Sequence, residues 1–459
     1  MRWRHLWLVR AGLAAGLISG MMFIGASTAT AQTGRPAVPD PEPSSLPAGV
    51  ATETVGLLEA RKAADLDVVA RGHGQDRVQL TIRNRSARRL NVIVPPGLVA
   101  ASTVGQGAAG GGGRLQSMGL GSVANREGAF GEFRGTAGPS GLRSVAATEE
   151  SRSRLVTLPV GETINLTLPS VCLNYGLPTP TPRNTFRLMD VDEYSSDPRV
   201  RMALRSLATY GTSLGVAQAV MWRVCNDLPF EMMAEQTGKI MNLHEIALAT
   251  RFVAALDASH AGGLVDPASL SGSRVFVQVS GEGSLAREAR RLAGGLDGLR
   301  ILGLPLQLVE SEDFPAAAAP ALYLHVVLTD AKLGDTRGRI MVSSCSQTDS
   351  WLPLGKVAFR DNSSISVLDG VILAKAIDRA IAGAFVTVKP ARRTLGSTTL
   401  KVENRLPFTV SNLVVKAGTS SGAPSVPFDC VGVGPARSAL LPIQAATASV
   451  VERVELNGL

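Results

Sequence analysis

The sequence is poor in the residues that most often carry chemistry. It has five histidines and four cysteines among 459 residues, and aromatic residues make up 4%. No Cys-x-x-Cys pair is present, and no cysteine lies near a histidine at the spacing of a zinc site. A glycine run at 110–113 is not followed by the Gly-Lys-Ser/Thr that opens a phosphate-binding helix. These absences disfavour zinc enzymes and nucleotide-binding loops, and we expect no cofactor.

Charge and aromatic content exclude two further classes of partner. The chain has 46 Lys and Arg against 38 Asp and Glu, but the basic excess forms no tract. We therefore expect no nucleic-acid partner. Only Trp222 and Trp351 remain beyond the N-terminal apolar segment. Faces that bind sugars usually present several aromatic rings, so this scarcity disfavours a sugar-binding module.

The one long apolar run lies at the N-terminus. Residues 1–10 are positively charged, residues 11–26 are apolar and uncharged, and small residues follow up to Ala31. This order predicts a signal peptide cleaved between Ala31 and Gln32. Since no later run reaches about 18 apolar residues, we expect no integral membrane segment after cleavage. The prediction is a secreted or periplasmic protein; an uncleaved N-terminal anchor is the alternative.

Hydrophobic periodicity predicts a multidomain α+β protein, with two antiparallel β-sandwich modules flanking a small helical bundle and an α+β domain. Alternation at 78–82 is typical of a half-buried strand, and Asp197-Pro198 is typical of a helix start. The expected units are a Pro-rich linker at 32–53, a β-sandwich module at 54–185 with a mobile Gly-rich insertion at about 101–153, a helical bundle at 186–262, an α+β domain at 274–390 and a C-terminal β-sandwich module at 391–459.

An internal repeat links the two predicted sandwich modules. The segment 80–85 matches 400–405, and each copy holds an Asn-Arg pair between two strands. Further along, Val160-Gly161 before Leu168-Pro169 matches Val433-Gly434 before Leu441-Pro442. We expect Asn84 and Asn404 to occupy the first hairpin turn of each module, where an Asn side chain can bond to its own backbone.

The repeated pattern resembles the small immunoglobulin-like and FxLYD-type modules of exported bacterial proteins. The resemblance is carried by 78–86 with 90–97, and by 400–405 with 413–418. It implies binding, spacing or adhesion. The chain departs from it by its glycine-rich insertion and by lacking a conspicuous core tryptophan in either copy.

Two of the four cysteines are close to the boundary of one predicted unit. Cys172 and Cys225 are the preferred disulfide pair, because an exported protein with an even number of cysteines can form disulfides. Buried free thiols are the alternative.

A few residues are candidates for chemistry. His244-Glu245 suggests a zinc site, but Leu248 stands where the second histidine of the motif belongs, and His260 is 16 residues away. Ser284 follows Gly281-Glu282-Gly283 after a predicted strand, which fits a helix cap, an anion-binding turn or a nucleophile.

Other polar residues have simpler interpretations. Asp190, Asp192 and Glu193 could hold Ca²⁺, and a solvated loop is the alternative. His325 alternates within a predicted strand and is expected on its solvent face.

The favoured hypothesis is an exported, non-enzymatic protein with a binding or structural role in the cell envelope. Its partner would be an envelope or extracellular protein or polymer, and the helices at 197–258 could dock such a partner. The alternative is a divergent hydrolase of envelope polymers, with Ser284, His244 and Glu245 in one cleft. We assign no catalytic, cofactor-binding or metal-binding residue.

Overall fold

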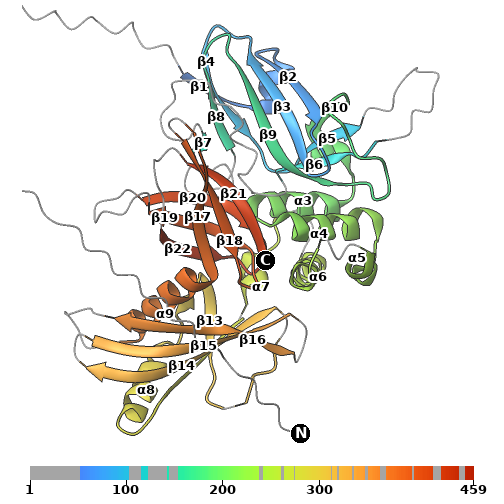
Figure 1. The fold of residues 1–459 in the computed structure, drawn as a ribbon. Coiled ribbons are helices and arrows are strands. Elements are labelled where there is room, and N and C mark those ends of the chain that lie inside the picture. Colours follow the sequence, from blue (N-terminus) through green and yellow to red (C-terminus); the bar gives the residue numbers. More distant parts are fainter. Residues whose placement is uncertain are drawn as a thin grey trace, which may run out of the picture. The chain divides into compact units, whose positions relative to one another are not determined.

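The described part of the chain begins after the expected signal peptide and most of the expected linker. The computed structural model describes residues 52–102, 115–121, 142–143, 154–236, 241–259, 263–272, 274–311, 313–317, 320–332, 335–346, 350–361, 369–394, 397–416, 425–443 and 450–459. Strands in several sheets are combined with helices, which confirms an α+β architecture (Figure 1). Among these residues no helix has the length and apolar character needed to cross a membrane.

The described residues of the N-terminal β unit form ten strands and one short helix. They are β1 (Thr52–Gly56), α1 (Leu57–Lys62), β2 (Leu66–Gly72), β3 (Arg77–Asn84), β4 (Arg89–Val94), β5 (Leu98–Ser102), β6 (Met118–Leu120), β7 (Leu142–Arg143), β8 (Arg154–Leu158), β9 (Thr163–Cys172) and β10 (Thr185–Asp190). Six of them close a barrel in the order β10-β2-β3-β9-β6-β5, and a second sheet has the order β1-β4-β8-β7. The alternation predicted for β3 is confirmed, because Val78, Leu80 and Ile82 are buried.

Barrel closure differs from the two-sheet module that the sequence predicted. The strand β6 lies inside the segment expected to be a mobile insertion, yet Met118 and Leu120 are buried in the core. It pairs with β5 on one side and β9 on the other. A strand of three residues is too short to show periodicity in the sequence, which explains why it was missed.

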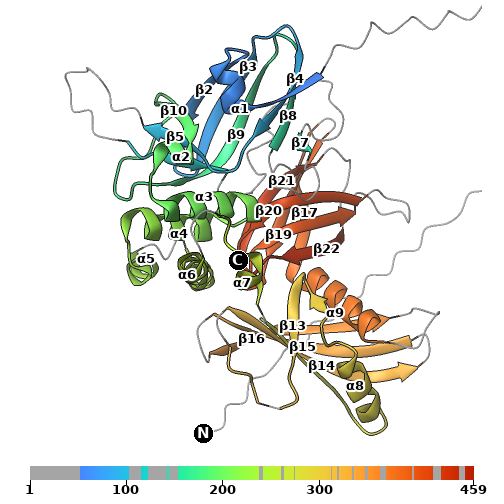
Figure 2. The same cartoon turned by 180° about the vertical axis from the view of Figure 1, so that it is seen from behind.

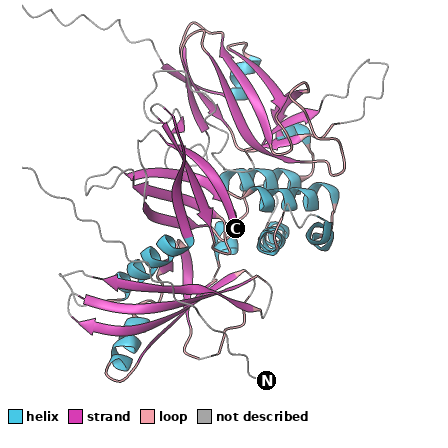
Figure 3. Cartoon of the chain, in the orientation of Figure 1, coloured by secondary structure: helices cyan, strands magenta, loops and turns pink. Residues whose placement is uncertain are grey.

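A group of helices follows the barrel (Figure 3). Its members are α2 (Val191–Tyr194), α3 (Pro198–Tyr210), α4 (Leu214–Asn226), α5 (Phe230–Gln236), α6 (Leu243–Ala258) and α7 (Pro267–Ser271). The predicted start of α3 is confirmed, since the Asp197 carboxylate accepts from the Arg199 N–H at 2.8 Å and Pro198 is the first helical residue. Asn242 and Glu245 form a capping box at the start of α6.

The next unit is a six-stranded sheet with two helices on one face (Figures 1 and 2). Its elements are β11 (Val275–Gly281), α8 (Leu285–Gly294), β12 (Arg300–Ile301), β13 (Leu304–Leu308), β14 (Ala321–Lys332), β15 (Asp335–Cys345), β16 (Trp351–Asp361) and α9 (Gly370–Phe385). The strand order is β12-β13-β11-β14-β15-β16. The apolar residues of one sheet face, such as Leu322, Leu324 and Val326, join the core beneath α8 and α9.

The C-terminal β unit has two three-stranded sheets. Its strands are β17 (Val386–Thr394), β18 (Ser397–Asn404), β19 (Val410–Lys416), β20 (Ser425–Val433), β21 (Arg437–Ile443) and β22 (Val450–Leu456). The sheets have the orders β17-β18-β21 and β20-β19-β22. The sequence assigned the strand after α9 to the α+β domain, but β17 pairs with β18 and belongs to this unit.

The internal repeat is confirmed in atomic detail, but neither asparagine lies in a hairpin turn, because the strands on either side of each turn belong to different sheets. The Asn404 amide donates to the backbone oxygens of Phe408, Val433 and Gly434 at 2.7–3.0 Å, and its Oδ1 accepts from the Leu406 N–H. Asn84 makes the matching bonds, to the oxygens of Arg88, Leu158 and Pro159 and from the Ser86 N–H. Each asparagine therefore ties the turn after its strand to the end of another strand.

In the second part of the repeat, the structural alignment is shifted by two residues from the match expected from the sequence. Leu80 pairs with Leu166, and the matching Leu400 pairs with Leu441. Leu441 thus corresponds to Leu166, whereas the sequence comparison aligned it with Leu168. A shift of two residues leaves every side chain on the same face of its sheet, so the hydrophobic pattern cannot detect it.

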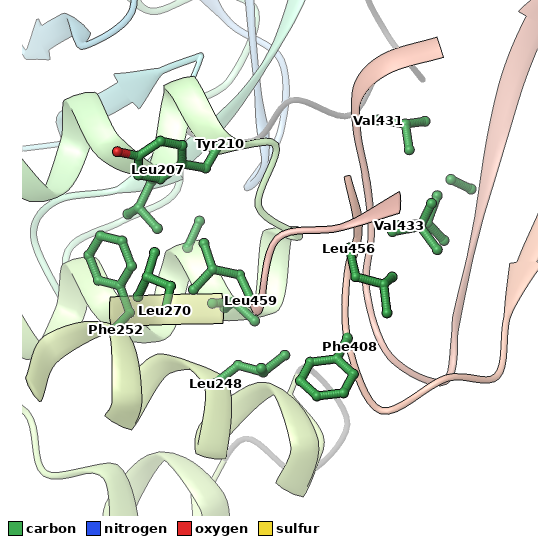
Figure 4. Packing of buried hydrophobic residues seen from close by; sticks show 14 of the residues in the cluster. Leu207, Tyr210, Leu248, Phe252, Leu270, Phe408, Val431, Val433, Leu456 and Leu459 are labelled. Atoms are coloured by element: carbon green, nitrogen blue, oxygen red, sulfur yellow. The ribbon is translucent and has the colours of Figure 1, made fainter. Parts of the chain in front are cut away.

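The helices and the C-terminal β unit share one apolar core, which we call the junction (Figure 4). The helices supply Leu207, Tyr210, Leu248, Phe252 and Leu270, and the C-terminal unit supplies Phe408, Val431, Val433, Leu456 and Leu459. The whole segment Val50–Leu459 is one compact unit. The helices are therefore packed against a neighbouring unit and do not stand apart as a bundle.

Candidate functional site

The face of the six-stranded sheet opposite α8 and α9, here called the open face, carries a cavity of about 720 Å³. Side chains alternate between the two faces of a strand, so residues two apart on one strand share a face. On β11, Gln278 and Ser280 line this cavity, while Val277 is in the core beneath the helices. The loop before β14 adds Phe314 to the lining. Residues from distant parts of the sequence therefore meet on one surface.

Strand register brings four of these side chains into a row. Gln278 on β11 pairs with His325 on β14, His325 pairs with Met341 on β15, and Met341 pairs with Lys356 on β16. All four residues line the cavity. Neighbouring strands lie roughly 4.8 Å apart, so the row crosses about 14 Å of the open face.

Aromatic rings occupy one end of the cavity. Phe314 stacks on Trp351 with ring centroids 5.6 Å apart, and both rings contact the ring of Tyr323. Phe276 meets Trp351 edge-on at 6.0 Å. This cluster is separate from the main core, and the side chain of Phe314 is 53% exposed. An exposed phenyl ring beside a cavity offers a surface on which an apolar group or a ring can pack.

Hydrogen bonds fix the polar groups beside the aromatic end. The Tyr323 hydroxyl donates to Gln278 Oε1 at 2.6 Å, and Gln278 Nε2 donates to the Ser311 carbonyl at 3.0 Å. Ser280 Oγ and His325 Nε2 are hydrogen-bonded at 2.8 Å. Burial raises the pKa of the Tyr323 phenol, so this group remains a donor at neutral pH. Donors and acceptors are thus held in place before any ligand arrives.

The charge of the open face is positive. Lys356 is exposed, and Arg339 lies on the same face because it is two residues from Met341 on β15. Within the described part of the chain neither side chain forms an ion pair. None of the described lining residues carries a carboxylate.

At the far end of β15 and β16, by contrast, the basic side chains are neutralised by a carboxylate. Arg337 and Arg360 both bind the Asp335 carboxylate, at 2.6 Å and 2.8 Å. These guanidinium groups hold the pKa of Asp335 well below its usual range. The two arginines therefore have a counter-ion of their own, unlike Lys356 and Arg339.

The residues expected for a hydrolase are used elsewhere. Glu245 is 1% exposed, and its carboxylate accepts from the Arg437 guanidinium at 2.8 Å and from the Asn242 N–H at 2.8 Å. Burial lowers the pKa of His244. The Glu245 carboxylate is already bound by Arg437 and by the capping box of α6. Ser284 precedes α8 and makes no capping hydrogen bond through its side chain. His260 is outside the described residues.

The carboxylates considered for Ca²⁺ are paired with basic side chains. Asp190 and Asp192 bind the Arg205 guanidinium at 2.9 Å and 2.8 Å, and Glu193 binds Lys62 at 3.3 Å. Asp190 also caps α2. Across the described ranges no group of three or more His, Cys, Asp or Glu side chains is arranged to hold a metal ion.

The disulfide expected between Cys172 and Cys225 is not formed, because both residues carry free thiols. The Cys172 thiol donates to Gln116 Oε1 at 2.7 Å. Burial raises the pKa of Cys172 and of Cys225 to about 12, so both thiols stay protonated. They match the alternative of buried apolar thiols, and such groups are unreactive.

Comparison of this chain with protein families, with curated proteins and with solved structures finds no match. The function of the open face therefore rests on the geometry of its residues.

Sequence reasoning placed His325 on the solvent face of its strand, which the structure confirms, but it did not identify the site. The hydrogen bond to Ser280 joins residues 45 positions apart. Polar residues at alternating positions of neighbouring strands, such as Gln278, Ser280 and His325, were the available signal. It becomes a site only once the register of four strands is known.

Proposed function

We propose that this chain is an exported protein of the cell envelope that binds a ligand in the cavity of the open face. The observation that supports the proposal is the cavity itself, in which an exposed aromatic ring lies beside fixed hydrogen-bonding groups and an unpaired cation. Concave sites that combine apolar walls with a few oriented polar groups are typical of ligand binding.

The rest of the described chain fits a scaffold for this site. We propose that the two repeated β units are variants of one sandwich-type module, the first modified by the strands that close its barrel. Their asparagine turns and the junction stabilise a rigid support. Sites supported by packed sheets keep their geometry better than sites on long loops.

One observation favours the alternative of hydrolysis. Ser280 is hydrogen-bonded to His325, as a serine nucleophile is to its general base. A serine nucleophile also needs a third group that orients the histidine and donors that stabilise an oxyanion. The described lining residues include no carboxylate for the first role. We therefore propose binding rather than catalysis as the activity of this cavity.

Truncation of Phe314 tests the binding site. F314A should weaken binding of the processed chain to the insoluble polymer fraction of a bacterial envelope by about tenfold, because a central aromatic contact often carries that much affinity. Co-sedimentation at several polymer concentrations measures the change. L352A is the matched control, since Leu352 is also exposed and lies on β16 outside the cavity lining. Equal binding by wild type and F314A would contradict the proposal.

Processing of the N-terminus tests export. With its native N-terminus, the chain should appear outside the cytoplasm and start at Gln32, as measured by mass spectrometry of cell fractions. L17R introduces a charge into the apolar run and should leave the full-length chain in the cytoplasm. R2K keeps the positive charge and should be processed like wild type. Cytoplasmic, unprocessed wild-type chain would refute export.

A further inference from the structure

The charge of the cavity indicates which class of ligand it can bind. Lys356 ends the cross-strand row, and Arg339 follows on the same face one pair of residues further along β15. The described acidic residues nearest in sequence to Phe314, namely Glu310 and Asp313, are not among the lining residues. A cation without an internal counter-ion beside a cavity is free to bind an anion from outside.

Ser280 and His325 can complete the recognition of an anion. They share one hydrogen bond at 2.8 Å, and a hydroxyl group can accept one hydrogen bond while donating another. When His325 Nε2 carries the proton, the Ser280 hydroxyl is free to donate to a bound oxygen. The cavity lining then presents the Ser280 hydroxyl on β11 and the Lys356 ammonium group on β16.

The aromatic end gives the ligand a second requirement. The Phe314 ring is stacked on Trp351, yet the side chain is still 53% exposed. Its exposed part is therefore available for contact with a ligand. An apolar group or a ring that packs there removes apolar surface from water. The cavity thus has an apolar end and a cationic end.

Resting on the proposed function, we infer that the cavity takes a ligand that carries a carboxylate or phosphate next to an apolar ring or alkyl group. Lys356 faces the anionic group, Arg339 adds positive charge beyond the lining on the same face of the sheet, and Phe314 supports the apolar part. Both sources of negative charge share the chemistry that the cavity offers, and they can be separated by experiment.

Small aromatic anions test this inference on the processed full-length chain. Phenyl phosphate and benzoate should bind more tightly than the neutral benzyl alcohol in ligand-observed NMR titrations. Added salt should weaken the binding of the two anions and leave the binding of benzyl alcohol unchanged. K356Q should weaken the binding of the anions about fivefold and leave benzyl alcohol unchanged. R360Q is the control, because Arg360 lies on the same strand and is already neutralised by Asp335.

The outcomes separate this inference from the proposed function. A preference for phenyl phosphate or for benzoate identifies the anion and supports the inference in either case. If benzyl alcohol binds as tightly as the anions, or if K356Q behaves like wild type, the inference is wrong. Polymer binding that still depends on Phe314 would then leave the proposed function standing.

Discussion

Replacing Arg437 with methionine should lower the free energy of unfolding by about 3 kcal/mol. Glu245 is 1% exposed, and its two carboxylate oxygens accept from Arg437 Nε at 3.1 Å and Nη2 at 2.8 Å. The methionine removes the cation and leaves a buried carboxylate without its partner. The cost falls in the lower part of the range for buried pairs because the Arg437 side chain is 37% exposed.

The surroundings of Glu245 leave it little room to adapt. A Cβ added at Gly215 would collide with its carboxylate, and the same carboxylate accepts from the Asn242 N–H in the capping box. The hydrogen bond to Glu245 also raises the pKa of Arg437, which therefore stays charged. The carboxylate can neither turn away nor reach water easily, so the loss of Arg437 is not compensated locally.

Urea denaturation of the wild type and three variants measures this effect. The double variant E245Q/R437M should regain most of the stability lost by R437M, because glutamine removes the buried charge and keeps an acceptor for Asn242. R453M is the matched control, since Arg453 pairs with Glu455 at the surface, and it should change stability by less than about 1 kcal/mol. Similar losses for R437M and R453M would show that the buried pair has no special role.

Truncation of Asn404 to alanine should cost about 3 kcal/mol of stability. Its side chain is 1% exposed and bonds to three backbone oxygens and one backbone N–H. The alanine variant leaves these buried groups without partners. N404D should be at least as damaging, because an aspartate oxygen would face carbonyl oxygens where an N–H donor is needed.

The repeat provides an internal comparison for this prediction. Asn84 makes the matching backbone bonds and also accepts from the Ser86 hydroxyl at 2.7 Å, but its contacts to Leu158 and Pro159 are longer, at 3.2 Å and 3.1 Å, and the second is only partly buried. N84A should therefore destabilise less than N404A in the same denaturation experiment. N165A, at an exposed side chain, is the control. If N404A unfolds at the same urea concentration as N165A, the turn bonds do not stabilise the fold.

Local signals in the sequence predicted the parts of the fold that depend on neighbouring residues. Asp197-Pro198 marked the start of α3, and the Asn-Arg repeat located two equivalent turns. Alternation identified β3, because Val78, Leu80 and Ile82 on one of its faces lie in the core. These features depend on periods of two or four residues, which a single sequence displays directly.

Long-range pairing could not be predicted in the same way. No local pattern indicates that Met118 and Leu120 complete a barrel, or that Glu245 and Arg437 meet across 192 positions. The open-face cavity has the same origin, since it depends on the register of four strands. A hydrophobic pattern identifies the buried face of a strand but does not specify its partner.

The direct passage from α9 into β17 has a mechanical consequence. Phe385 is the last residue of the helix and Val386 the first of the strand, so no linker separates the two. The Phe385 carbonyl accepts from the Arg405 N–H at 2.8 Å, and its ring packs beside Gly355, which lines the cavity. A force applied to the C-terminal strands is therefore transmitted to the cavity through α9, because no flexible linker separates this helix from β17.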